Sequence, residues 1–459
     1  MRTLDQILTK KDYSRKTPAS LFYKDSPLWQ KLLRIGCMVF LSVAGLGEWK
    51  YLNNMLGGLP KAVSLGVIGL AVLYTLFYPD EKRLREIWKP TLLYMSLMAA
   101  LFFWSIIIWI KSFSEVSSMI RSCSKVLFQS IAILTAVALV YLFREKAIEL
   151  FTICICIING AIMLLCIPGY GIAASIQSLI TCLVTFGDAV GYARQLEIHD
   201  LTFVFGQMIV YYAVFAPHTT REEKRKRWRY LLLCIWFFLV GMKRSAIPAV
   251  VLFIMVGLLL RKRKLPDWFY PVVGVGCIVF FLVFLYCVRN GIVTALLLRF
   301  DIDMMGRDCL WSLANPYYEF SITYIGHGFE YVDSLVTLWY NEGILNHPYP
   351  FHNDILKVFV EMGFPGFMLW SGIQYVLTPL FWQRYADQQT TLLYMCVLGY
   401  MTVTYLTDNT AFYFWSAMAL RLLPLAYAMN RKKPPKPKVW MPDSRQEMRD
   451  RIRVLMQEG

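Results

Sequence analysis

Long apolar runs recur along this chain, and they limit the folds open to it more than any other feature does. A helix needs about 20 mostly apolar residues to cross a lipid bilayer, and twelve runs come close to that length. They cover residues 32–47, 62–78, 91–110, 126–143, 147–167, 201–216, 230–242, 245–260, 268–288, 355–381, 391–406 and 412–429. Hydrophobic residues make up 57% of the sequence and charged residues only 17%, which is more apolar surface than one water-soluble core needs. The pattern predicts an all-α, polytopic membrane protein with about twelve transmembrane helices.

Basic residues gather in short segments between the apolar runs. Six such segments fall on alternate sides of the predicted spans, in phase with one another: KKDYSRK, DEKRLREIWK, REK, REEKRKRWR, RKRK and RKKPPKPK. Short loops rich in Lys and Arg stay on the cytoplasmic side of a membrane. The net charge of +16 is therefore explained by topology, with anionic lipid headgroups as partners. Because the basic residues are dispersed over six short segments, a nucleic-acid partner is not expected.

The same phasing divides the chain into three parts. Residues 1–31 form a basic cytoplasmic N-terminal arm, residues 32–429 a multi-pass membrane domain, and residues 430–459 a basic cytoplasmic tail. Within the membrane domain, residues 168–200 and 289–354 are the two sizeable loops expected outside the membrane. The second is rich in Asp and Glu and is large enough for a small extracytoplasmic cap.

The sequence predicts neither a metal site nor structural disulfides. The eleven cysteines are scattered, mostly singly within apolar runs, where a thiol behaves as a small hydrophobe. The five histidines form no HExxH pattern. Asp301 and Asp303 form an Asp-x-Asp pair, but the predicted topology puts this pair outside, where nucleotide sugars are absent, and we interpret it as a solvated loop face. We expect neither a metal nor another cofactor.

One predicted helix start carries many polar groups, in the stretch 347–370, HPYPFHNDILKVFVEMGFPGFMLW. Asn353 or Asp354 is suited to cap a helix beginning near residue 355. Lys357 and Glu361 continue along the same helical face as Asp354. A carboxylate as deep as Glu361 is costly against lipid, so it should face a polar environment lined by protein.

Two glycines follow in the same helix. Gly363 and Gly366 flank Pro365, and this arrangement favours a kink and the close approach of another backbone. Plain helix packing is the alternative explanation for both glycines.

These residues together resemble a known signature. The pattern His352-Asn353-x-x-Leu356-x-x-x-x-Glu361-x-Gly363-x-x-Gly366 is similar to that of the O-antigen polymerase and O-antigen ligase superfamily. Upstream, GRDCLW at 306–311 and GHGF at 326–329 resemble the family's Gly-Arg segment and its Gly-x-Gly-Phe turn. MKRSA at 242–246 lies where the family often has Ser-Arg-Gly. Here the sequence departs from the pattern, because Lys243 replaces a small hydroxyl residue and Ala246 replaces the glycine.

The resemblance implies a GT-C-like glycosyltransferase in the cytoplasmic (inner) membrane of a bacterium, with its active site facing outward. Such enzymes take a glycan from an undecaprenyl-diphosphate carrier. Polymerases pass it to a hydroxyl of another lipid-linked repeat unit, in capsule, exopolysaccharide or O-antigen biosynthesis, and this is our main interpretation. Ligases pass it to lipid A core, which is the first alternative. A polysaccharide transporter or flippase is the alternative from another class. A chain-length regulator and a flippase would be partners of a polymerase.

The resemblance also assigns residues to this chemistry. An attacking sugar hydroxyl needs a base poised near neutral pH, for which His352 is the candidate. The departing diphosphate needs fixed positive charge, for which Arg244 and Arg307 are the candidates. The further substrate-binding candidates are Arg289, Arg299, Lys243, Asn353, Glu361 and Asp408. We interpret His327 as a turn residue. An interfacial role for His352 and a simple turn between helices at Asp408 stay open as alternatives.

Overall fold

The computed structural model describes residues 28–56, 59–112, 116–144, 146–185, 189–301, 306–348 and 350–430. Across these residues every regular element is a helix and no strand occurs, which confirms the all-α prediction for this part of the chain. Of the predicted arm at 1–31, residues 28–31 are described, and they form the start of helix α2 (Leu28–Leu46). Of the predicted tail at 430–459, Asn430 alone is described, and the rest lies outside the described residues.

The twelve predicted apolar runs lie in twelve helical stretches of the described chain. These are α2, α5 (Leu65–Phe77), α6 (Glu81–Ser112), α7 (Val116–Phe143), α8 (Lys146–Tyr170), α11 (His199–Val210) with η3 (Tyr211–Phe215), α12 (Arg221–Val240), α13 (Ala246–Leu260), α14 (Phe269–Arg289), α18 (Asp354–Gly372) with η5 (Ile373–Leu377) and α19 (Thr378–Tyr385), α20 (Gln388–Thr407), and α21 (Phe414–Asn430). In the described part of the chain, six of these stretches contain a segment long and apolar enough to cross a membrane. They are α2, α6, α7, α8, α14 and α20. The chain is therefore a multi-pass membrane protein.

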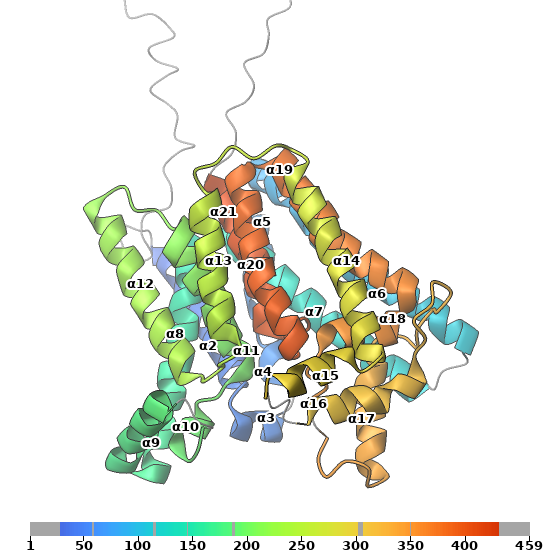
Figure 1. Cartoon of the computed structure of the whole chain (residues 1–459). Helices are drawn as coiled ribbons and strands as arrows, with labels where there is room; N and C mark the ends of the chain where they lie inside the picture. Colours follow the sequence, from blue (N-terminus) through green and yellow to red (C-terminus); the bar gives the residue numbers. More distant parts are fainter. Residues whose placement is uncertain are drawn as a thin grey trace, which may run out of the picture.

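The remaining helices are short and gather at one end of the bundle, the lower end in Figure 1. They are α3 (Lys50–Leu56), α4 (Leu59–Ala62), α9 (Ile172–Thr185), α10 (Tyr192–Gln195), α15 (Ile292–Arg299), α16 (Arg307–Ala314), η4 (Asn315–Tyr317) and α17 (Tyr331–Asn341). We call this the cap end. The opposite end carries the basic first turns of α12, residues 221–229, and the basic turn between α13 and α14, and we call it the basic end. Both predicted external loops, 168–200 and 289–354, thus contain helices, and these helices lie at the same end.

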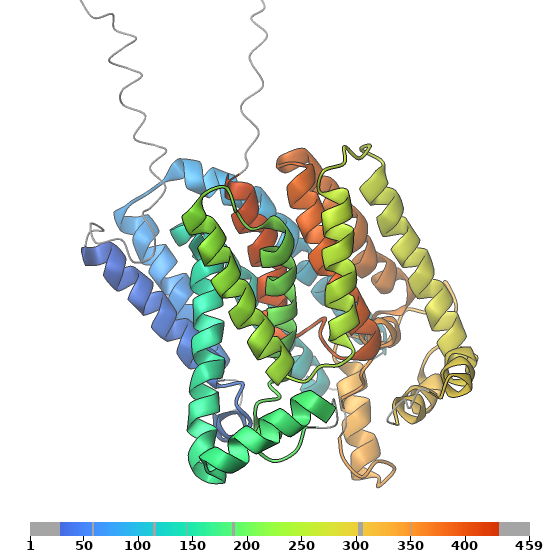
Figure 2. The same cartoon turned by 60° about the vertical axis from the view of Figure 1, so that its left-hand side comes forward.

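The centre of the bundle is formed by α7 and α21, which pack along each other. In the best membrane-spanning window of α7, 72% of the residues are buried, against 28% in those of α2 and α14. A helix that is apolar on all sides is expected either inside a large core or against lipid. Burial separates these two cases: α7 and α21 form the core, while α2 and α14 lie at its edge with much of their apolar surface exposed (Figures 1 and 2).

A sharp kink interrupts α18 at Gly363, whose φ of 62° and ψ of −173° are not helical. At this point the backbone of segment 289–354 comes so close that a Cβ on Gly363 would lie 2.2 Å from the carbonyl carbon of Ile325. The break leaves the carbonyl of Glu361 outside the helical pattern, and the N–H groups of His327 and Gly328 donate to it at 3.0 and 2.7 Å. The predicted kink and close backbone approach at Gly363 are confirmed.

The second glycine of the pair has a different neighbour. A Cβ on Gly366 would lie 2.6 Å from the indole ring of Trp104 on α6, so a side chain, and not a backbone, occupies the space. The Trp104 indole N–H donates to the carbonyl of Met362 at 2.8 Å, another carbonyl beside the kink. Gly366 therefore serves the packing of α6 on α18.

Candidate functional site

Charged side chains from four segments of the chain meet at the cap end. Glu197 and His199 lie at the start of α11, Lys243 in the turn between α12 and α13, His352 just before α18, and Asp408 just after α20. Contacts of 2.9 to 4.0 Å join them in a chain that runs His199, Glu197, Lys243, Asp408, His352. We call these five residues the His352 cluster.

The central contact of the cluster pairs His352 with Asp408. Nδ1 of His352 lies 3.4 Å from Oδ1 of Asp408, a little longer than a formed hydrogen bond. Burial by itself raises the pKa of Asp408, but the interactions with His352 and Lys243 outweigh it and bring that pKa down to about 2. A carboxylate that stays negative beside Nδ1 orients the imidazole and favours the tautomer with its proton on Nδ1. Nε2 is then left as the acceptor, which is the state required of a general base.

The backbone around His352 is held in an uncommon conformation. His352 has a φ of 55°, a left-handed value that costs of order 1–3 kcal/mol for a residue other than glycine and persists only where the surroundings enforce it. Asn353 caps α18 by accepting the N–H of Leu356 at 3.0 Å. Asp354 accepts the N–H of Ala411 at 2.7 Å, which ties the start of α18 to the turn that carries Asp408. The two halves of the pair are thus fixed to each other.

These contacts confirm one of the two caps that the sequence allowed. Asn353 is the capping residue, and α18 begins at Asp354, one residue earlier than predicted. The side chain of Asn353 is fully buried, and its oxygen is engaged in the cap.

Lys243 links the cluster to α11. Its Nζ lies 2.9 Å from Oε1 of Glu197 and 4.0 Å from Oδ2 of Asp408, and its side chain is only 12% exposed. The preceding Met242 has a φ of 51°, which makes the turn between α12 and α13 tight. Arg244, the residue after Lys243, is exposed. The turn therefore brings Lys243, the residue that departs from the family pattern, into contact with Asp408.

The other predicted arginines lie at the cap end, at the end of α14 and on the short helices α15 and α16. Arg289 ends α14, donates to the carbonyl of Asn315 and lies over the ring of Tyr318, 4.9 Å from its centroid. It joins α14 to the cap. Arg299 is the exposed last residue of α15, and Arg307 is the half-buried first residue of α16. In the described part of the chain, neither of these two contacts the His352 cluster.

Comparison with known proteins identifies the central part of the chain. Residues 230–371 match the model of a family described as O-antigen ligase. The resemblance to O-antigen polymerases and ligases is confirmed. The matched region includes Lys243, Arg244 and His352, whereas Asp408 and the Glu197–His199 pair lie outside it. No curated protein matches the sequence.

Within the matched region 230–371, Glu361 belongs to a second charged group. Nζ of Lys357 lies 2.8 Å from Asp333, 3.6 Å from Glu330 and 3.9 Å from Glu361, and Lys125 of α7 lies 3.5 Å from Glu330. We call these five residues the Lys357 network. Lys357, Glu330 and Glu361 are all at most 5% exposed. As predicted, Glu361 faces polar protein groups.

The Lys357 network fixes the short helix α17 on α18. The carboxylate of Glu361 accepts the N–H of Val332 in the first turn of α17 at 3.1 Å, so α18 caps a short helix of the cap end. Burial raises the pKa of Glu330. Burial acts in the same direction on Asp333, but Lys357 and Lys125 bring its pKa well below the ordinary value. Glu361 is therefore placed in this network, and no contact joins it to His352 in the described part of the chain.

The GHGF segment at 326–329 is a turn. Nε2 of His327 lies 2.7 Å from the carbonyl of Tyr317, and the ring stacks on Tyr331 with centroids 4.1 Å apart. Burial lowers the pKa of His327. Its ring is thus engaged in packing, in agreement with its interpretation as a turn residue.

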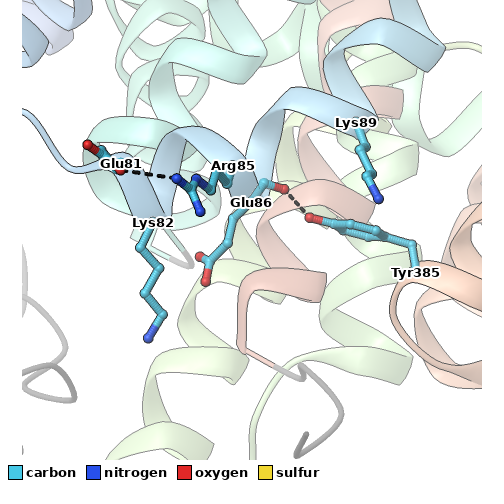
Figure 3. Close-up of a pocket in the computed structure, with 6 residues that line it drawn as sticks. All are labelled: Glu81, Lys82, Arg85, Glu86, Lys89 and Tyr385. Carbon is cyan, nitrogen blue, oxygen red and sulfur yellow. Dashed lines mark hydrogen bonds and ion pairs between the residues drawn. The ribbon is translucent and has the colours of Figure 1, made fainter.

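A hollow of about 450 Å³ lies at the basic end, far from the His352 cluster (Figures 1 and 3). It is lined by Glu81, Lys82, Arg85, Glu86, Lys89 and Tyr385. Arg85 pairs with Glu81 at 3.2 Å, and the Tyr385 hydroxyl donates to the carbonyl of Glu86. No histidine or cysteine of the described chain lines this hollow, and its lysines suit anionic lipid headgroups. Of these two places, the His352 cluster is the candidate functional site.

Two members of that cluster were not predicted from the sequence. Glu197 and His199 lie outside the pattern that carries the resemblance, and neither residue stands out alone. The one available signal was their position directly before the apolar run at 201–216. The predicted Asp-x-Asp pair is described only at Asp301, which is exposed, and Asp303 lies outside the described residues.

Proposed function

We propose that this protein is a bacterial membrane glycosyltransferase that extends a polysaccharide from lipid-linked repeat units. The donor is a glycan on undecaprenyl diphosphate, and the acceptor is a hydroxyl of another lipid-linked repeat unit. The observation that carries the proposal is the pair of His352 and Asp408, whose nitrogen and oxygen are 3.4 Å apart, within a chain that matches the O-antigen ligase family over residues 230–371.

The proposed reaction is a displacement at the anomeric carbon of the donor glycan. Nε2 of His352 takes the proton of the acceptor hydroxyl while the hydroxyl oxygen forms a bond to that carbon. The bond from the carbon to the diphosphate oxygen breaks, and undecaprenyl diphosphate leaves with the electron pair. Asp408 stabilises the imidazolium that forms. The proton then passes from His352 to water or to the released diphosphate.

Positive side chains would neutralise the leaving diphosphate in this reaction. Lys243 already lies beside Asp408. The next residue in the same turn, Arg244, is exposed and can reach the substrate. An arginine can contact two phosphate oxygens at once. We propose Arg307 as a further contact from the cap, and we propose that the chain uses these cations in place of a metal.

The proposed topology places this reaction on the outer side of the cytoplasmic membrane. Twelve helical stretches correspond to the twelve apolar runs, and the basic turns lie at the end opposite to the His352 cluster (Figure 1). Twelve crossings with basic segments inside would put both ends of the chain in the cytoplasm and the cap outside. A GT-C-like architecture, a flippase that delivers the donor and a chain-length regulator are parts of the same proposal.

A ligase is the second candidate, because the matching family carries that description. The two activities share the donor and differ in the acceptor. The test is therefore the purified protein in phospholipid nanodiscs with a synthetic undecaprenyl-diphosphate repeat unit, either alone or together with lipid A core. Ladders of lengthened lipid-linked glycan are the expected result. Transfer to lipid A core alone would support the ligase, and no transfer to either acceptor would contradict the glycosyltransferase.

A further inference from the structure

Helix α9 presents three different faces. One face is buried against the protein through Ser175 and Cys182. A second face is exposed and apolar, with side chains four residues apart that are 53% to 76% exposed. These are Ile172, Ile176, Ile180 and Val184. The third face is exposed and polar: Gln177, Thr181 and Thr185. At about 3.6 residues per turn, the apolar and polar stripes lie side by side along the helix.

The buried face is pinned, so α9 cannot turn its apolar stripe inward. The hydroxyl of Ser178 donates to the carbonyl of Val190 at 2.8 Å and accepts the N–H of Ala193 at 3.1 Å. Tyr192 in turn donates to the carbonyl of Met163 on α8 at 2.8 Å. The contacts fix the orientation of α9 relative to the bundle.

The apolar stripe continues an apolar surface of α8. Gly171, with a φ of 80°, forms the turn between the two helices, and Figure 2 shows α9 lying across the end of α8 at the cap end. Just before this turn, Leu164 and Leu165 of α8 are 69% and 53% exposed. No Asp, Glu, Lys or Arg occurs from residue 150 to residue 187. Because α8 is long and apolar enough to cross a membrane, its exposed leucines face lipid, and the stripe extends the same surface.

We propose that α9 is an interfacial helix whose apolar stripe inserts among the acyl chains of the leaflet at the cap end. Its polar stripe then faces the headgroups and water, and its buried face holds the protein. Helices of this kind lie in the plane of the membrane surface with one side immersed. A protein partner is a poorer fit, because the stripe contains only Ile and Val, without the Trp, Tyr or Arg that anchor most protein interfaces.

The inference does not depend on the proposed reaction, but it has a consequence for it. The chain runs from α9 through α10 directly to Glu197 and His199. An α9 at the membrane surface would therefore hold the His352 cluster near the depth of the lipid headgroups, where the diphosphate of a polyprenyl carrier lies.

Photo-crosslinking from neighbouring positions on α9 tests this placement. A photoreactive amino acid is introduced at Ile176 or Ile180, and at Gln177 or Thr181 as matched controls, in the full chain reconstituted in phosphatidylethanolamine and phosphatidylglycerol vesicles. All four side chains are exposed, so the substitutions leave the packing intact. Mass spectrometry of the illuminated protein should find severalfold more lipid adducts from the two isoleucine positions than from the two polar positions.

Two outcomes would overturn the inference. Equal lipid yields from all four positions would mean that α9 has no lipid-facing side. Crosslinked dimers from Ile176 and Ile180 in place of lipid adducts would assign the stripe to a second copy of the chain. Neither outcome bears on transfer activity, which is measured separately with the unsubstituted protein.

Discussion

Two charged groups border α18, one at its start and one around Lys357 and Glu361 in its first turns. They differ in how completely they are paired. In the His352 cluster, the contacts of Asp408 with His352 and Lys243 measure 3.4 and 4.0 Å, and the side chain of His352 is 21% exposed. In the Lys357 network, a buried lysine lies within 2.8 to 3.9 Å of three carboxylates. The first group keeps bonding capacity for a ligand, whereas the second uses its capacity to join α17 to α18. Residue type alone does not separate these two roles.

The largest effect is expected from His352→Asn. Asparagine tolerates the left-handed backbone of residue 352, so the variant should fold, but it cannot act as a base. General acid–base catalysis contributes about 10²–10⁴-fold, and the rate of glycan transfer should fall by that factor. The measurement is chain extension in nanodiscs, with His218→Asn at the basic end as the control. Unchanged transfer would show that His352 is only an interfacial residue.

Lys357→Met tests the other side of the comparison. Removal of one partner from a buried ion pair costs about 3–5 kcal/mol, because the remaining charges stay buried without compensation. The free energy of unfolding should fall by that amount, while the protein that remains folded keeps most of its transfer rate. Thermal unfolding and transfer are measured on the same preparation. Normal stability with lost transfer would instead place the Lys357 network in the chemistry.

The pairing of Asp408 predicts a particular dependence of stability on pH. The pKa of Asp408 is lowered from 3.8 to about 2 in the folded protein, so the ionised form is favoured by folding. The resulting stabilisation of roughly 2 kcal/mol is fully present above about pH 4 and is lost as the pH falls through about 2. The stability difference between wild type and Asp408→Asn should shrink over this window. A difference that stays constant from pH 5 to pH 2 would mean that Asp408 is not held by His352 and Lys243.

The smallest effects, about tenfold each, separate the two cations of the α12–α13 turn. Lys243 contacts Asp408 before substrate arrives, so Lys243→Met should chiefly lower kcat. Arg244 is exposed, and Arg244→Lys should chiefly raise KM for the donor, because a point charge cannot reproduce a bidentate contact. Steady-state kinetics with donor as the varied substrate distinguish the two. The same change in both variants would contradict separate roles.

The sequence revealed those parts of the structure that depend on residues close in the chain. Apolar runs gave the helices, the Asn353 cap follows from its neighbours, and the kink needs only the glycine at position 363. The contacts between these elements join residues that are far apart in the sequence. Glu197 reaches Lys243 across 46 positions, and Trp104 reaches Met362 across 258, and no local pattern encodes such pairs.

The sequence also could not tell which of the two basic residues, Lys243 or Arg244, contacts Asp408. Both residues are basic and adjacent, so charge and spacing do not distinguish them. Their directions depend on the left-handed backbone of Met242, a residue type that gives no warning of that conformation. The α17 cap by Glu361 was equally hidden, because the sequence predicted an external loop over 289–354 and no helix at α17.

The kink at Gly363 has a consequence for the order in which this protein is assembled. Inside a bilayer, each backbone carbonyl without a partner costs several kcal/mol. The carbonyl of Glu361 receives its donors from His327 and Gly328, which precede α18 in the chain and lie in the segment at the cap end. With the cap outside, as we propose, α18 cannot reach its final state during biosynthesis until that segment has been translocated and folded against it. A substitution at Gly326, where a Cβ would lie 2.4 Å from that same carbonyl oxygen, would then act as a defect of membrane integration, although it lies outside every membrane helix.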